Sequence, residues 1–324
     1  MMGDAARVVI WRGEIRESVH NVLAVVCDRA GNVEEAWGNP TEVILPRSSS
    51  KMIQALPLLT SGAAEAYRLT DAHLALACAS HQGAPIHTDP VRRWLSDLGL
   101  DDGALRCGPQ LPPDRTTRTA LIKSDDSPCQ YHNNCSGKHT GFLTLTQHLQ
   151  AGPEYIDPDH PVQVAVRSAQ EEVTEEGART FAIDGCSAPN FAVSLRGLAR
   201  AMASFATAPG GTAQARLTAA MMAHPALVAG EGRACTELMR AIPGQAALKT
   251  GAEGVFVGIL PGMGKGIAVK AVCGTTRAAE AVITALLIRF GLIDQDDPAA
   301  LRRVNGPILN RRDLPTGKVT IEFP

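Results

Sequence analysis

The spacing of apolar and polar positions changes along this chain and predicts its organisation. Residues 7–12, 19–28 and 33–37 are rich in Val and Ile, and 29–32 carries a turn signal, which favours a strand meander. From Ser48 to His224 the apolar positions recur with the helical period of 3.6 residues. The helices expected there span 49–61, 71–79, 88–98, 137–150, 160–176, 194–207 and 212–224.

The strand pattern returns near the end of the sequence. Strands are expected at 246–250, 254–260 and 266–272, followed by a helix at about 275–290. Strands at both ends with helices between predict an α+β fold, in which both termini build one mostly antiparallel sheet and a helical lobe is inserted.

We expect all 324 residues to form a single catalytic domain. Its sheet lobe would cover approximately 1–47 and 245–324, and its helical lobe approximately 48–244. The polar, proline-containing stretch 99–126 predicts a long loop, a kind of segment that often edges an active site.

Composition narrows the class of protein. A net charge of −2 and the absence of a dense basic cluster argue against nucleic-acid and membrane-surface partners. Aromatic residues make up only 4%, too few for base-stacking platforms. The start of the sequence lacks the apolar run of a secretory signal, so we expect a cytoplasmic protein. The eight cysteines do not resemble a disulfide framework, so we expect each of them either to be packed in the core or to have a chemical role.

The sharpest chemical feature is Ser48-x-x-Lys51, where the first strands meet the first helix. A spacing of three places the amine one helical turn from the hydroxyl, so an uncharged Lys51 could take the proton of Ser48. Burial and a nearby cation such as Arg47 favour the uncharged amine. The alternative is structural: Ser48 or Ser49 caps the helix and Lys51 is solvated.

A second cluster runs from Cys129 to Gly141 and opens another helix. A cysteine at a helix start has a stabilised thiolate, so Cys135 is a candidate nucleophile or metal ligand, with Lys138 one turn on. A rival zinc set can be drawn from the same stretch and consists of Cys129, His132, Cys135 and His139. A purely structural role for the cluster stays open.

Taken in order, five motifs closely resemble the L-asparaginase II family typified by the rhizobial inducible enzyme. They are Arg47-Ser48-x-x-Lys51, Cys78-Ala79-Ser80-His81, Asn134-Cys135-Ser136-Gly137-Lys138-His139, Asp184-Gly185-Cys186 and Lys249-x-Gly251-Ala252. The resemblance implies hydrolysis of L-asparagine to L-aspartate and ammonia, on a fold similar to serine β-lactamases and glutaminases. It also suggests a homodimer.

The same resemblance implies roles for individual residues. Two Ser-Lys pairs would be catalytic, Ser48 with Lys51 and Ser80 with Lys249. A zinc ion would be bound by Cys135, Lys138 and Cys186, with water as the fourth ligand. Substrate-binding positions would be Arg47, His81, His139 and Asp184. Lysine can bind zinc only as a neutral amine, a form that the divalent ion itself favours.

The resulting hypothesis is an acyl-enzyme mechanism in which Ser48, deprotonated by Lys51, attacks the side-chain amide of asparagine. Ser80 and Lys249 would relay protons. Within the same class, a zinc-bound hydroxide could attack without a covalent intermediate, or the protein could be a β-lactamase-like or glutaminase-like serine acylase. From another class, it could be a metal-binding sensor without catalysis.

Overall fold

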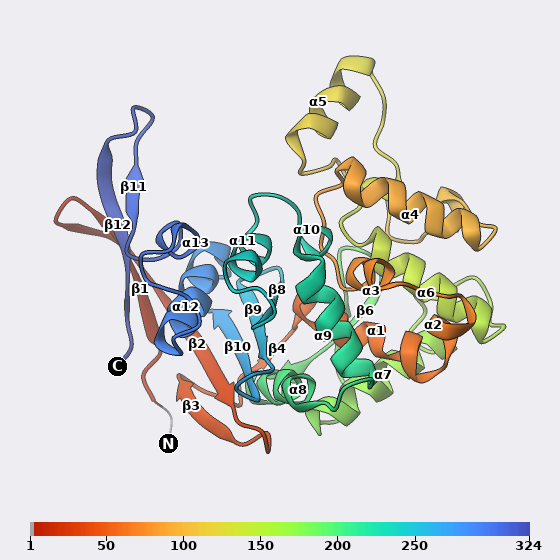
Figure 1. Ribbon diagram of the computed structural model, residues 1–324, viewed down its shortest axis with the longest axis horizontal. Helices are drawn as coiled ribbons and strands as arrows, with labels where there is room; N and C mark the ends of the chain where they lie inside the picture. The colour runs from red at the N-terminus through yellow and green to blue at the C-terminus, as the bar shows by residue number, and fades with distance from the viewer. Residues whose placement is uncertain (1–2) are drawn as a thin grey trace. The chain divides into compact units, whose positions relative to one another are not determined.

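The computed structural model describes residues 3–324 (Figure 1). These residues divide into two compact units. The sheet unit contains the described residues up to Ser49 together with 193–208 and 237–324. The helical unit contains 50–192 and 209–236. A helix from the middle of the sequence, α8 Leu195–Thr207, therefore belongs with strands from both ends of the chain.

Both ends of the sequence build the sheet, as predicted. Within residues 3–324 its strands follow the order β11-β12-β1-β2-β10-β9-β8, with β3 also paired to β2. Every pairing is antiparallel. The strands are β1 Ala6–Arg12, β2 Ile15–Cys27, β3 Val33–Trp37, β8 Ala247–Thr250, β9 Val255–Leu260, β10 Lys265–Ala271, β11 Pro307–Leu309 and β12 Pro315–Glu322. The α+β prediction is confirmed.

The middle of the sheet is buried on both faces. All six residues of β9 are buried, a run expected of a strand that is covered on both sides rather than alternating with water. The helix α8 packs against β2, β9 and β10, and α12 Thr276–Arg289 packs against β9 and β10. The predicted helix at about 275–290 is the second of these two helices.

Close packing of α8 depends on a glycine in the sheet. A Cβ atom at Gly266 of β10 would overlap the backbone of Ala199, Met202 and Ala203. The backbone of α8 and the strand β10 therefore approach each other more closely than any residue with a side chain at this position would permit. The missing side chain at Gly266 fixes how this helix covers the sheet.

Shorter elements complete the sheet unit. The strand β4 Val43–Ile44 pairs with β7 Val193–Ser194 and leads towards the 3₁₀ turn Arg47–Ser50. The helix α13 Pro298–Leu301 follows α12. A further helix, α11 Ala234–Ala241, includes residues of both units.

The helical unit holds most of the predicted helices. Its helices are α1 Lys51–Thr60, α2 Ala63–Ala66, α3 Asp71–Ala77, α4 Pro85–Asp97, α5 Arg115–Ser124, α6 Ser136–His148, α7 Pro161–Thr174, α9 Ala213–Ala223 and α10 Pro225–Val228. It also contains the 3₁₀ turns Asp102–Ala104 and Gln130–His132 and the hairpin of β5 Phe181–Ile183 and β6 Pro189–Phe191. None of the helices within residues 3–324 combines the length and apolar character needed to cross a bilayer.

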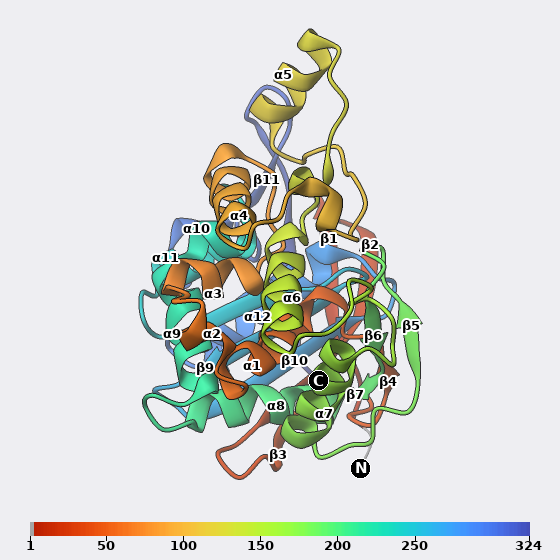
Figure 2. The same ribbon diagram turned by 90° about the vertical axis from the view of Figure 1, so that its right-hand side faces the viewer.

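The central helix of this unit is α6. Residues 136–146 are all buried, and the helix contacts α1, α3, α4 and α7, as the views of Figures 1 and 2 let the reader follow. A Cβ atom at Gly137 would overlap the carbonyl oxygen of Leu76, so this glycine lets the first turn of α6 lie directly against α3. That approach brings the ends of α1, α3 and α6 together.

One sequence-based expectation was wrong, and two strands were missed. The stretch 99–126 is not one loop, because α5 occupies 115–124, and Thr117 N donates to the capping carboxylate of Asp114 at 2.7 Å. No residue of α5 is buried, so no apolar stripe marks it. The strands β11 and β12 were not expected, since both begin with proline, β11 is largely exposed and β12 is mostly half-buried. The single-domain assignment stays a prediction.

We expect Gly266→Ala to lower the free energy of unfolding by about 1–3 kcal/mol, because the new methyl group must push α8 away from the sheet. Urea denaturation followed by circular dichroism measures the change. Gly262→Ala is the matched control, since a Cβ atom there meets nothing within 4 Å, and its effect should stay within about 0.5 kcal/mol. Equal effects of the two substitutions would contradict the packing argument.

Candidate active site

A group of polar side chains is buried in the helical unit, where α1, α3 and α6 begin or end. Lys51 opens α1, Ser80 follows α3, and Cys135 precedes α6. Lys138 lies in the first turn of α6, and Cys186 lies in the turn between β5 and β6. We call these five residues the lysine–thiol cluster. Four separate sequence motifs thus meet in one place.

The amine of Lys51 is the centre of this cluster, with only 1% of the residue exposed. Its Nζ donates to the carbonyl oxygen of Ala79, to Ser80 Oγ at 3.1 Å and to Cys135 Sγ at 3.1 Å. A lysine ammonium has three N–H donors, so these three acceptors satisfy it without water. A buried amine held directly against a hydroxyl is the arrangement that proton transfer to or from that hydroxyl requires.

Backbone hydrogen bonds hold the segment that carries Ser80. Ser80 N donates to the Val228 oxygen at 2.9 Å, and His81 N donates to the Asn134 oxygen at 3.2 Å. The second bond ties this segment to the residue just before Cys135. Ser80 is therefore fixed relative to α6 by its main chain and not only by its side chain.

His81 is fully buried, and both of its ring nitrogens bind protein groups. Gly83 N donates to Nδ1 at 3.1 Å, so the ring proton lies on Nε2, which donates to Ser136 Oγ at 2.9 Å. Burial, reinforced by the neighbouring His87, holds the pKa of His81 well below its usual value. The neutral ring thus holds the backbone after Ser80 in place through these two hydrogen bonds. A role of His81 in substrate binding stays a prediction.

The two thiols of the cluster shift each other's pKa in opposite directions. A hydrogen bond from Cys135 and the nearby ammonium of Lys138 hold the pKa of Cys186 well below that of a free thiol, against the effect of burial. The same hydrogen bond, together with burial, raises the pKa of Cys135. Cys186 is therefore the more acidic thiol of the pair, and Lys138 Nζ donates to its sulfur at 3.0 Å.

Lys138 is charged in this arrangement. Burial lowers the pKa of its amine, but the sulfurs of Cys186 and Cys135 outweigh that effect, and the pKa is raised above the ordinary value. A metal cation that replaced a proton of the Lys138 amine would be close to the sulfurs of Cys135 and Cys186 and to the nitrogen of Lys138. These are the donor atoms that zinc prefers.

The residues present therefore fit a zinc ion with a mixed sulfur and nitrogen donor set. Residues 3–324 contain no group of three or more His, Cys, Asp or Glu side chains placed to hold a metal, so the set depends on the lysine nitrogen. The rival set of Cys129, His132, Cys135 and His139 is wrong, because these side chains are not gathered. Cys129 and His132 instead contact one another, with Sγ 3.4 Å from Nδ1.

His139 presents a buried hydrogen-bond donor in the neighbourhood of the Cys186 sulfur. Arg106 N donates to the Tyr155 hydroxyl at 2.7 Å, so that hydroxyl donates to His139 Nδ1 at 2.8 Å. The ring proton then lies on Nε2, which is buried and has no hydrogen-bond partner within residues 3–324. Burial lowers the pKa of His139 to about 4, so the ring is neutral. A neutral N–H donor suits a substrate oxygen.

The remaining predicted residues lie at the ends of strands and in turns. Asp184 is half-buried, accepts from Gly185 N at 2.7 Å, and is one of the charges that raise the pKa of Lys138. Lys249 is fully buried on β8, and its amine donates to the Thr250 oxygen at 2.8 Å. Arg47 and Ser48 are half-buried in the 3₁₀ turn that precedes α1.

The pairs Ser48 with Lys51 and Ser80 with Lys249 each combine a residue of the sheet unit with one of the helical unit, and they stay predictions. Hydrogen bonds within the sheet unit do distinguish Ser48 from Ser49 as the candidate for the attacking hydroxyl. Ser49 Oγ donates to the Pro46 oxygen at 2.7 Å and is fully buried, so it is committed to the backbone. Ser48 is the more exposed of these two neighbours.

A family model for L-asparaginase II matches residues 8–321, nearly the whole sequence. The chain belongs to the L-asparaginase II family. Membership in this family supports a hydrolase, and the ordered motifs that carried the resemblance all lie within the matched range. A search of curated proteins found no match.

Several solved structures are similar to this member of the L-asparaginase II family. Mglu in its native form is 15% identical with a TM-score of 0.46, over 89% of this chain and 68% of Mglu. A beta-lactamase from Mycobacterium bovis is 14% identical with a TM-score of 0.46, over 83% of this chain and 94% of that one. A putative beta-lactamase from Bacteroides dorei is 13% identical with a TM-score of 0.43, over 78% and 85%. At these identities and TM-scores the likeness says nothing about activity.

Sequence reasoning missed Tyr155, although this residue sets the tautomer of His139. It is fully buried, and burial raises the pKa of its hydroxyl. Tyr155 lies 16 residues beyond His139 in a segment with glycine and proline. No local spacing marks it, because the contact depends on how the loop after α6 folds back.

We expect His81 to make the protein less stable in acid. The unfolded chain takes up a proton at this residue near pH 6.5, whereas burial keeps the folded ring neutral to much lower pH. Between those two pKa values the unfolded state binds more protons, so stability falls as pH drops below about 6.5, by at most ~1.4 kcal/mol per pH unit.

Urea unfolding of the wild type and His81→Gln between pH 8 and pH 5 tests this expectation. The variant should be less stable at pH 8, because it loses the paired ring nitrogens, and the difference should shrink as the pH falls. A difference that stays constant over this range would show that His81 does not contribute.

Proposed function

We propose that this protein hydrolyses L-asparagine to L-aspartate and ammonia through a serine acyl-enzyme. The observation that carries the proposal is the buried amine of Lys51, held 3.1 Å from the hydroxyl of Ser80 at the start of α1. Family membership supports the amide substrate. The buried Nε2 donor of His139, on α6, supports the binding of a substrate oxygen within the helical unit.

In the proposed first step, Ser48 attacks the carbonyl carbon of the side-chain amide and passes its proton to the uncharged form of Lys51. Ser48 lies in the 3₁₀ turn that leads directly into α1 at Lys51, and side chains three residues apart align in such a turn. Backbone N–H groups at the start of α1 would stabilise the oxyanion.

Collapse of the tetrahedral intermediate breaks the carbon–nitrogen bond. The leaving nitrogen takes the proton held by Lys51 and departs as ammonia, leaving an ester between Ser48 and the substrate acyl group. Water then adds to this ester, gives a proton to the amine, and releases aspartate as Ser48 regains its hydrogen. Ser80, in contact with Lys51, and Lys249 would relay these protons.

Cys135, Lys138 and Cys186 would hold the zinc ion of this proposal. When bound, zinc supplies a fixed positive charge that orients the substrate or its neighbouring water. The ammonium of Lys138 must give up its proton to become a ligand, and its raised pKa means that binding competes with protons. Zinc affinity should therefore fall in acid. A homodimer remains part of the proposal.

We expect Ser48→Ala to lower kcat for asparagine by at least about 1,000-fold, because the attacking oxygen is removed. Ammonia release measures the rate. Ser49→Ala is the matched control: that hydroxyl is bonded to the Pro46 oxygen, so the variant should lose stability but keep its rate within about tenfold.

Other outcomes would distinguish the alternatives. Full activity in Ser48→Ala together with loss on chelation would favour attack by a zinc-bound hydroxide. Hydrolysis of a chromogenic β-lactam or of glutamine in preference to asparagine would indicate a serine acylase of other specificity. Zinc binding without ammonia release from any amide would support the alternative that the protein is a metal-binding sensor.

We expect the protein dialysed against Zn²⁺ to retain about one zinc ion per chain, and Cys186→Ser to bind it at least about 10-fold more weakly, because a thiolate ligand is lost. Mass spectrometry of the metal content provides the measurement and does not depend on activity. Cys273→Ser removes an exposed thiol of the sheet unit and should retain zinc. Equal metal content in both variants would exclude the proposed ligand set.

A further inference from the structure

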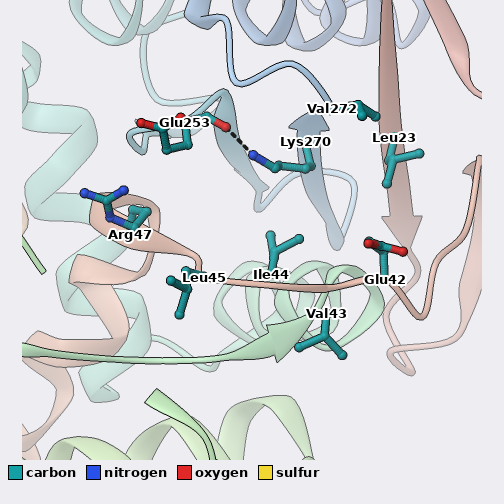
Figure 3. A pocket seen from close by; sticks show the side chains of 9 residues that line it. All are labelled: Leu23, Glu42, Val43, Ile44, Leu45, Arg47, Glu253, Lys270 and Val272. Atoms are coloured by element: carbon teal, nitrogen blue, oxygen red, sulfur yellow. Dashed lines mark hydrogen bonds between the residues drawn. The ribbon is translucent and has the colours of Figure 1, made fainter. Parts of the chain in front are cut away.

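A pocket in the sheet unit carries charged groups that the proposed mechanism does not yet use. It has a volume of about 360 Å³, which lies in the range of small-molecule sites. Figure 3 shows its lining, which comes from β2, the segment around β4, the turn after β8 and the end of β10. The lining residues are Leu23, Glu42, Val43, Ile44, Leu45, Arg47, Glu253, Lys270 and Val272.

Two cations are among the residues that line this pocket. Lys270 is half-buried at the end of β10, and its amine donates to the backbone oxygen of Glu253. Burial lowers the pKa of Lys270, the carboxylate of Glu253 opposes that effect, and the guanidinium of Arg47 lowers the pKa further. A positive and a negative group of the same pocket thus act on the amine of Lys270, and the carboxylate of a ligand would add a second negative charge beside it.

The position of Arg47 links the pocket to the candidate nucleophile. Arg47 has a φ of 53°, a left-handed conformation that is uncommon for a residue with a side chain. That conformation begins the 3₁₀ turn whose next residue is Ser48. Behind the turn, Gly251 leaves room for it, since a Cβ atom there would lie 2.8 Å from the Pro46 oxygen. The turn is therefore tightly packed with Arg47 at the pocket.

The other lining residues limit the ligand to a small molecule with both charges. Glu42 and Glu253 are acidic, so the pocket offers positive and negative groups together. Leu23, Ile44 and Leu45 supply apolar contact between them. An α-amino acid has this composition: a carboxylate, an ammonium and a short carbon chain.

Resting on the asparaginase function proposed above, we propose that this pocket binds the α-carboxylate of the amide substrate, and that Lys270 and Arg47 are the cations that hold it. Lys270 is then a specificity-determining residue. The enzyme would require a free α-carboxylate, and it would reject asparagine whose carboxyl group is esterified or joined in a peptide bond.

The test crosses a change in the protein with a change in the substrate. Ammonia release is measured for wild type and Lys270→Gln with L-asparagine and with L-asparagine α-methyl ester, which lacks the carboxylate charge. For asparagine, Lys270→Gln should lower kcat/KM about 10- to 100-fold, mainly through KM, because a charge-assisted hydrogen bond is lost. For the ester, the same substitution should change kcat/KM less than about threefold.

Two further variants complete the design. Lys270→Arg keeps the positive charge and should restore most of the preference for asparagine over its ester. Lys318→Gln removes an exposed lysine on β12 of the same sheet and should leave both substrates unaffected. If Lys270→Gln loses the same factor for both substrates, or keeps the full preference of the wild type, the pocket does not bind the carboxylate.

Failure of the proposed function gives a different result. If the wild type releases ammonia from neither substrate, the asparaginase proposal fails and the pocket is tested by calorimetry with L-aspartate. Binding by the wild type that is lost in Lys270→Gln would still support the carboxylate site. Absence of binding by the wild type, or equal binding by both proteins, would overturn it.

Discussion

The structure depends on placing a lysine amine inside the helical unit with every N–H donor satisfied. Lys51 is buried at the first residue of α1, where desolvation of a charge would cost several kcal/mol without partners. A backbone oxygen, a hydroxyl and a sulfur from two other segments compensate for that cost. The packing of α1, α3 and α6 is therefore coupled to the chemistry, since moving any one of them leaves a buried polar group unpaired.

Glycine makes this arrangement possible in both units. Gly137 allows the first turn of α6 to contact the backbone of α3, which brings Cys135 and Lys138 to the end of the helix that precedes Ser80. Gly266 does the same between β10 and α8 in the sheet unit. In each case the distance between two backbones is set by the absence of a side chain, so the position of functional groups follows from close packing.

The cluster also distributes protons unevenly among similar groups. Cys135 and Cys186 are both buried, yet their pKa values move in opposite directions, because each sulfur acts on the other and the amine of Lys138 donates to the sulfur of Cys186. Tyr155 similarly fixes the proton of His139 on Nε2. A set of residues with ordinary chemistry thus acquires defined donors and acceptors, which is what binding and turning over an amide substrate requires.

The sequence by itself determined the antiparallel sheet built from both termini, the helical lobe between them and the family, because apolar periodicity and ordered motifs are local properties of the chain. It also pointed to Ser80, Cys135 and Cys186, since each follows or precedes a recognisable element. Only the tertiary structure decided that Lys51 contacts Ser80 and Cys135, that Tyr155 orients His139, and that Lys270 faces a pocket with Arg47. Those contacts join residues 16 to more than 200 positions apart, and their distances depend on close approaches of helices and strands that no short window of sequence encodes.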